Sequence, residues 1–205
     1  MKLIGITPES NVDNEAVLIA NLLDAGIDEM HIRKPTSPVD AVARLLQDIP
    51  EPFHARLILH EHFDLTHRFG IGGIHLNRRN SHKPTDYHGK IGRSCHTLDE
   101  VAHSVDTDYC FLSPIYNSIS KVGYMARFTD KDLEQAACDG IIGPHVYALG
   151  GITPHNLPQL QRYGFGGAAF LGYLWNDLTL HNLPERVYSL RSVLTSDNHY
   201  NQNNF

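Results

Sequence analysis

The stretch Val146-Tyr147-Ala148-Leu149-Gly150 is a short apolar run that stops at a glycine, and it decides the fold because the chain repeats it. Other runs of strand length break off in a similar way, nearly all at Gly, His, Ser, Arg or Lys, and they cover residues 2–7, 30–33, 57–60, 73–76, 90–94, 109–113 and 168–172. Most gaps between these runs have room for a helix. This alternation predicts repeated βα units around a parallel sheet, and a closed barrel of such units places every strand end on one rim.

Helical patterns fill most of the gaps. We expect helices over residues 13–25, 38–49, 129–137, 153–163 and 182–194, a short turn of helix over 63–69, and a loop over 77–89. Thr97-Leu98-Asp99-Glu100 has the pattern of a capping box at the start of another helix.

An open doubly wound sheet would give the same local pattern as a barrel. The first βα turn, however, lacks a glycine-rich dinucleotide fingerprint, and eight units are many for an open sheet in a chain of 205 residues. The predicted fold class is therefore α/β, a single compact (β/α)8 TIM barrel. We expect residues 1–195 to form the barrel and residues 196–205 to form a polar C-terminal tail.

The composition is that of an ordinary soluble protein, with 41% hydrophobic and 20% charged residues. A net charge of -6 argues against nucleic-acid binding, because no broad basic field offsets phosphate repulsion. Neither a membrane-spanning stretch nor a signal-peptide pattern is seen, so a cytoplasmic location is expected. Three dispersed cysteines make a disulfide framework improbable. Histidine is unusually frequent at 14 residues, and we interpret several, His54 among them, as surface residues.

The clearest ligand signal is Gly150-Gly151-Ile152-Thr153-Pro154 after the seventh run, together with Gly172 after the eighth. Barrel enzymes often bind a phosphate with these two loops, and glycine lets backbone N–H groups approach the anion closely. Tight turns alone would explain the same glycines. Ser118, Ser120 and Lys121 lie in the loop after the sixth run, where a lysine preceded by hydroxyls could bind a phosphate or simply be solvated.

Two other positions at strand ends carry candidate chemistry. Arg33 and Lys34 end the second run, and only one of two adjacent cations can face the interior, so either could bind the substrate. His96 follows the fifth run and precedes the capped helix, which is a suitable place for proton transfer at neutral pH. A structural role for this histidine remains the alternative.

His60-Glu61-His62 combines three residues of metal-ligating types. In a continuing strand, His60 and His62 would share one face. Structural zinc sites usually have four ligands, however, and the sequence does not complete such a set. We interpret His75, which lies inside a strand, as a core histidine.

In chain order these motifs resemble the thiamine phosphate synthase and TenI superfamily of small (β/α)8 barrels. The resemblance extends from Leu3 to about Trp175. It is carried by Arg33-Lys34-Pro35, residues 60–65 (HEHFDL), residues 73–80 (GIHLNRRN), residues 92–100 (GRSCHTLDE), residues 113–121 (SPIYNSISK) and residues 148–152 (ALGGI).

The resemblance implies one of two activities. The synthases join a pyrimidine diphosphate to a thiazole phosphate and hold Mg²⁺ with two motif aspartates, whose positions here are Glu61 and Asn80. The TenI-type relatives lack those aspartates and tautomerise a thiazole phosphate with the histidine of Gly-Arg-Ser-x-His, which this chain keeps with Ser94 and His96. An asparagine offers Mg²⁺ only a neutral oxygen, which weakens the synthase interpretation.

The sequence therefore favours a metal-independent thiazole phosphate tautomerase that needs no cofactor. In this hypothesis His96 shuttles the proton, and the amides of Gly151 and Gly172 hold the phosphate with help from Ser118, Ser120 or Lys121. The alternatives are an Mg²⁺-dependent thiamine phosphate synthase, a non-catalytic thiazole phosphate-binding protein, and an unrelated phosphate-binding barrel isomerase. The oligomeric state, a homodimer included, is left open.

Overall fold

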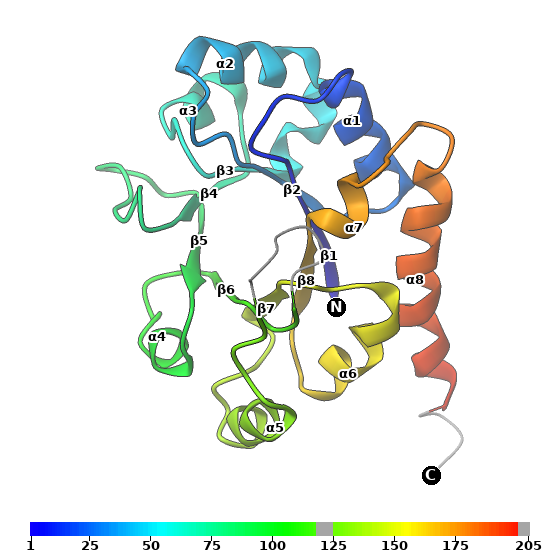
Figure 1. Cartoon of the computed structure of the whole chain (residues 1–205). Coiled ribbons are helices and arrows are strands. Elements are labelled where there is room, and N and C mark those ends of the chain that lie inside the picture. The colour runs from blue at the N-terminus through cyan, green and yellow to red at the C-terminus, as the bar shows by residue number, and fades with distance from the viewer. Residues whose placement is uncertain (118–124, 201–205) are drawn as a thin grey trace.

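The chain folds into a closed barrel of eight parallel strands, as a computed structural model shows (Figure 1). The structure describes residues 1–117 and 125–200, with side chains up to residue 195. Each strand pairs with its sequence neighbour and β8 closes onto β1, which confirms the predicted (β/α)8 class. The strands are β1 (Lys2–Ile6), β2 (Glu29–Ile32), β3 (Leu57–Leu59), β4 (Gly73–Leu76), β5 (Lys90–Cys95), β6 (Tyr109–Leu112), β7 (Val146–Leu149) and β8 (Gly167–Phe170).

Helices surround most of this barrel (Figure 1). They are α1 (Glu15–Ala25), α2 (Val39–Asp48), α3 (Leu65–Phe69), α4 (Leu98–Ala102), α5 (Asp130–Cys138), α6 (Leu157–Arg162), α7 (Gly172–Trp175) and α8 (Leu183–Tyr200), with 3-10 turns η1 (Glu51–Arg56) and η2 (Pro154–Asn156). As expected, β4 and β5 are joined without a helix.

Three elements differ from the sequence prediction. The α7 helix and the η1 turn were not expected, because each is too short to display a 3.6-residue apolar period. The last helix, α8, was expected to end at residue 194 but continues to Tyr200. Its final turns are polar and have no apolar stripe that would mark them as helical.

The predicted cap of α4 forms in part. The Thr97 hydroxyl accepts a hydrogen bond from the Glu100 backbone N–H at 3.1 Å. The Glu100 carboxylate, however, accepts from the backbone N–H of His96 rather than from that of Thr97. The Glu100 side chain therefore binds the backbone of His96, the residue before the N-cap Thr97, and does not complete the capping box.

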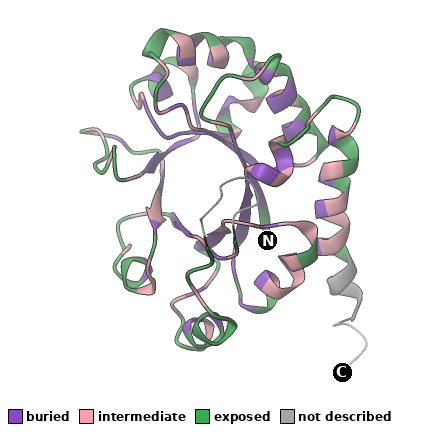
Figure 2. Cartoon of the chain, viewed as in Figure 1, coloured by how far each residue is buried: buried purple, intermediate pink, exposed green. Residues whose placement is uncertain are grey.

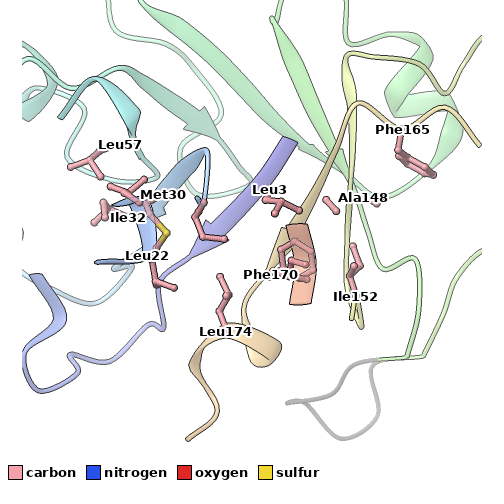
Figure 3. Packing of buried hydrophobic residues seen from close by; sticks show 14 of the residues in the cluster. Leu3, Leu22, Met30, Ile32, Leu57, Ala148, Ile152, Phe165, Phe170 and Leu174 are labelled. Atoms are coloured by element: carbon pink, nitrogen blue, oxygen red, sulfur yellow. The ribbon is translucent and has the colours of Figure 1, made fainter. Parts of the chain in front are cut away.

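Strand residues divide between a large core under the helices, the barrel interior and a small third cluster of Ile74, Leu76, Tyr87 and Ile91. Outward-facing residues such as Leu3 and Met30 pack with helix residues such as Leu22 and Leu174 (Figure 3). Inward-facing residues fill the barrel interior, and they are Ile4, Ile6, Tyr109, Phe111, Tyr147 and Ala169. Most strand residues are buried, so the barrel wall forms a nearly continuous buried ring (Figure 2).

The interpretation of His54 as a surface residue is wrong. Its side chain is buried, with Nδ1 2.7 Å from the Phe69 carbonyl and Nε2 2.9 Å from the Ile49 carbonyl. The η1 turn carries this histidine to the C-terminal ends of α2 and α3, where helix carbonyls lack intrahelical partners. Within the part of the chain that the structure describes, no helix has the length and apolarity needed to cross a bilayer.

Candidate functional site

A cavity of about 460 Å³ opens at the carboxyl ends of the strands. Its lining combines polar strand-end residues with loop glycines, and it includes Arg33, His60, Asn77, Arg78, Ser94, His96, Ser113, Gly150, Gly151 and Gly172. These positions lie far apart in the sequence, yet the parallel barrel delivers all of them to one rim. The structure therefore brings His96 and the predicted glycines around a single cavity.

Hydrogen bonds fix both the ring and the backbone of His96. Its Nδ1 lies 3.1 Å from the Ser113 carbonyl oxygen and 3.2 Å from the Ser113 hydroxyl. A carbonyl oxygen only accepts, so the neutral ring that makes this bond carries its proton on Nδ1 and leaves Nε2 as the basic nitrogen. Arg127 donates to the His96 carbonyl at 3.2 Å, while Glu100 accepts from its N–H.

The loop after β7 needs its glycines. Gly150 and Gly151 have φ values of 104° and 65°, which L-residues rarely adopt. A Cβ on Gly151 would lie 2.2 Å from the Asn117 carbonyl oxygen, so the loop after β6 also approaches too closely for a side chain. Gly172 lies on the same cavity, at the start of α7.

The two adjacent cations that follow β2 point to different places. Arg33 lines the cavity and forms an ion pair with Glu9 at 2.7 Å. Lys34 is 1% exposed, with its Nζ 2.7 Å from Glu15 and 2.8 Å from the Ser10 carbonyl. Arg33 is thus the one that faces the candidate site.

The positions that the resemblance links to Mg²⁺ do not form an open carboxylate site. One oxygen of Glu61 accepts from the Lys34 backbone N–H at 2.9 Å, and the other pairs with Arg79 at 2.9 Å. The Asn80 side chain donates to the His60 carbonyl at 2.9 Å. Neither Glu61 nor Asn80 lines the cavity. A paired carboxylate and a neutral amide turned elsewhere do not fit Mg²⁺, which favours unengaged oxygen ligands.

Of the other predicted site residues, one lies on the cavity and three lie outside the described residues. Ser94 lies on the cavity as expected, whereas Ser118, Ser120 and Lys121 lie outside the described residues. Sequence reasoning missed Arg78 and Ser113. The signal available for Arg78 was its place two residues after a strand end, where side chains of a parallel barrel reach the rim.

Three buried histidines lie together beneath the cavity. His31 Nδ1 is 2.9 Å from His60 Nε2, and the rings of His60 and His75 stack with centroids 4.4 Å apart. Burial lowers the pKa of His31 and of His60 well below the ordinary value. Burial, aided by the positive charge of Arg93, lowers the pKa of His75 to about 3. All three imidazoles are therefore neutral near pH 7.

The expectation that His60 and His62 share a face is wrong. The β3 strand ends at Leu59, and His62 has a φ of 54°, so strand alternation does not continue. The ring of His62 contacts the Ser37 carbonyl at 2.9 Å instead. His75 is a buried core residue as interpreted, but it contacts His60, which sequence reasoning did not foresee.

Comparison with known proteins extends these observations. The family model for thiamine monophosphate synthase matches residues 3–173. A thiamine-phosphate synthase of Caldicellulosiruptor bescii is 27% identical over 208 residues, covering 95% of this chain and 92% of that protein.

Solved structures agree with this match. The crystal structure of a thiamine phosphate pyrophosphorylase from Bacteroides thetaiotaomicron is 38% identical, with a TM-score of 0.86, covering 95% of this chain and 98% of that chain. A thiamine phosphate pyrophosphorylase from Pyrococcus furiosus, at 16% identity and a TM-score of 0.76, shares the fold, with 95% and 96% of the two chains covered. The family match spans most of the barrel, and this chain belongs to the thiamine monophosphate synthase family of enzymes.

Proposed function

We propose that this enzyme binds a phosphorylated thiazole of thiamine biosynthesis in the cavity at the barrel mouth and tautomerises it without a metal. One observation carries the proposal: His96, Gly151 and Gly172 line the same cavity. A volume of about 460 Å³ suits a small phosphorylated molecule.

The substrate's two ends would meet different parts of the rim. The phosphate would bind the backbone N–H groups of the loops that contain Gly151 and Gly172, where side chains do not obstruct its approach. Arg33 and Arg78 also line the cavity and would bind further negative charge, including a substrate carboxylate. Arg93 is not among the cavity-lining residues, so it is not assigned this role.

His96 would carry the proton. Its Nδ1 faces the Ser113 carbonyl, so Nε2 would accept the proton from one carbon of the bound thiazole and return it to another. One C–H bond breaks and another forms, and no atom is gained or lost. The phosphate anchor supplies the orientation that such a transfer needs.

Thiamine phosphate synthesis is the second candidate function, and the names of the relatives favour it over tautomerisation. Both Caldicellulosiruptor bescii thiamine-phosphate synthase and the Bacteroides thetaiotaomicron pyrophosphorylase align along nearly the whole chain. The pairing of Glu61 with Arg79 and the neutral Asn80 favour the tautomerase instead.

Two assays on the purified chain separate the candidates. In the first, thiazole tautomer phosphate is converted in the presence of EDTA by the wild-type protein and by His96→Ala. In the second, pyrimidine diphosphate, thiazole phosphate and Mg²⁺ are mixed and thiamine phosphate is measured. We expect chelator-resistant tautomerisation that His96→Ala abolishes. Chelator-sensitive formation of thiamine phosphate would establish the synthase, and tight thiazole phosphate binding by calorimetry with no turnover in either assay would indicate a binding protein.

A further inference from the structure

The buried histidines at the floor of the cavity form a constellation that neither candidate reaction uses. His31 lies on β2, His60 directly follows β3, and His75 lies on β4, so three neighbouring strands each contribute one imidazole. One nitrogen of each ring lies within 4.8 Å of the others. His31 and His75 are fully buried, and His60 is 4% exposed.

We propose that His31, His60 and His75 form a binding site for a divalent transition metal of the zinc class, open toward the cavity. Imidazole nitrogen is a preferred ligand of Zn²⁺, and three-histidine sets hold catalytic zinc in other folds. The inference is independent of the proposed tautomerase reaction.

The spacing of the nitrogens is close to what a metal requires. Tetrahedral Zn²⁺ with bonds of about 2.0–2.1 Å separates its ligand nitrogens by about 3.3 Å. His31 Nδ1 and His60 Nε2 already lie 2.9 Å apart and face each other. Metal binding would replace the proton between these two nitrogens. It would also bring the ligand nitrogen of His75, which lies within 4.8 Å of the other two, closer to them.

Neighbouring groups hold the rings in place. Tyr109 Oη lies 3.4 Å from His31 Nε2 and 3.3 Å from His75 Nδ1, and Ser94 Oγ lies 2.9 Å from His75 Nε2. Such outer hydrogen bonds orient metal-bound histidines in known sites, and a metal on His75 would replace one of its two bonds and keep the other. Phe111 packs on His31 and on His75, with ring centroids 4.8 Å and 4.5 Å apart, which keeps that side of the cluster dry.

Protonation does not compete with the metal near pH 7. The lowered pKa of each histidine keeps its ring neutral, which is the form that binds metals. Lys90, Arg33, Arg79 and Arg93 place positive charge around the cluster and oppose a dication. Glu29 partly offsets this by pairing with Lys90 at 2.6 Å.

The fourth coordination position would face the cavity. His60 is the one of the three that lines the cavity, so a metal bound to its nitrogen has its open side toward that space. Catalytic zinc sites have this composition, with three protein ligands and one exchangeable position. The alternative state is a metal-free hydrogen-bonded chain through His60, His31, Tyr109, His75 and Ser94.

The test titrates the chelator-treated full chain with Zn²⁺ by calorimetry and with Co²⁺ by visible absorption. We expect one tight site per chain and the intense absorption bands of four-coordinate Co²⁺. His31→Gln and His60→Asn should each weaken the affinity by about 100-fold or more, because each removes one of three ligands. Asparagine is polar and smaller than histidine, so this variant is expected to keep the fold.

His88→Gln is the matched control, because His88 is exposed and is not one of the three clustered histidines. It should leave the tight site unchanged, and circular dichroism should show that each variant is folded. The proposal is overturned if no tight site is found, if both cluster variants bind Zn²⁺ as tightly as the wild type, or if His88→Gln weakens binding equally. If His31→Gln does not fold, His60→Asn alone decides.

Discussion

The two halves of the barrel mouth differ in what their polar groups contact. On the side of β5–β8 the cavity is lined by backbone glycines and by His96, whose Nδ1 contacts Ser113 while its Nε2 remains for a ligand. On the side of β2–β4 several charged side chains form ion pairs, namely Lys34–Glu15, Arg33–Glu9 and Glu61–Arg79.

This difference indicates where chemistry can occur. Side chains already paired need to break an ion pair before they can bind a ligand or metal, whereas loop amides and an imidazole nitrogen are ready to do so. The β5–β8 side is therefore the reactive half in our proposal. The β2–β4 side provides charge and structure, and beneath it lies the histidine cluster formed by His31, His60 and His75.

Removal of the imidazole on the reactive side should have the largest effect. We expect His96→Ala to lower the tautomerase kcat by about 10²–10⁴-fold, the usual contribution of a general acid–base group. Steady-state kinetics measure this. His103→Ala, an exposed residue at the end of α4, is the control and should retain activity. Full activity in His96→Ala would remove the contrast between the two halves.

Breaking the buried pair on the other side should affect stability rather than chemistry. Lys34→Met leaves the Glu15 carboxylate buried without its cation, so we expect a loss of about 3–5 kcal/mol in the free energy of unfolding. Urea denaturation measures it. The double variant Lys34→Met/Glu15→Leu should recover much of the loss. A stable single variant would show that this pair is not structural.

The histidine cluster should make stability depend on pH. The folded-state pKa values of His31, His60 and His75 are depressed, that of His75 to about 3, so their contribution is present above the unfolded pKa near 6.5 and is lost progressively as pH falls below it. Each histidine contributes a slope of up to about 1.4 kcal/mol per pH unit. In urea unfolding with EDTA, His31→Gln should be less sensitive to acid between pH 6.5 and 5 than the wild type, and an equal slope would contradict this.

Substitution of the glycine on the reactive side should weaken binding. Gly151→Ala adds a Cβ against the Asn117 carbonyl and displaces amides from the phosphate, so we expect KM to rise about tenfold. Gly164→Ala is the control, because Gly164 also has a positive φ of 83° but its Cβ would meet nothing within 4 Å. The control should lose about 1–2 kcal/mol of stability without a change in KM. Equal KM values for the two variants would rule out a binding role for the loop.

The smallest effect is expected at Arg79, the half-exposed partner of Glu61 on the β2–β4 side. Arg79 is 47% exposed, so Arg79→Ala should cost at most about 1 kcal/mol of stability. Thermal denaturation measures this. The same variant releases a Glu61 oxygen, and the Mg²⁺ synthase assay should nevertheless stay negative because Asn80 supplies no carboxylate. Appearance of Mg²⁺-dependent turnover would show that the ion pair alone separates the two activities.

The sequence predicts the barrel well because its signals are local. Each strand is an apolar run bounded by polar or glycine residues, so strands such as β4 and β7 were placed within one residue of their observed ends. The α7 helix was missed because four residues cannot show a period. Gly150 and Gly151 were also recognisable, since positive φ and close approach both select glycine.

The pairing of side chains was harder to predict. Which of Arg33 and Lys34 faces the cavity depends on Glu15 of α1, a contact between residues 19 positions apart. The histidine cluster combines positions on β2 and β4 with one just after β3, and its geometry follows from the register between these strands rather than from spacing along one of them. His62 does not share a face with His60, because the strand ends at Leu59, before both residues.

The shared use of Glu100 has a consequence for engineering this enzyme. The Glu100 carboxylate accepts a hydrogen bond from the His96 backbone N–H, and the Glu100 N–H donates to the Thr97 hydroxyl. The first turn of α4 and the position of the His96 imidazole are therefore linked. We therefore expect fraying of this short helix to displace His96. A redesign that turns the Glu100 carboxylate to the Thr97 N–H would complete the capping box and stabilise the helix, but it would remove the hydrogen bond that holds the His96 backbone.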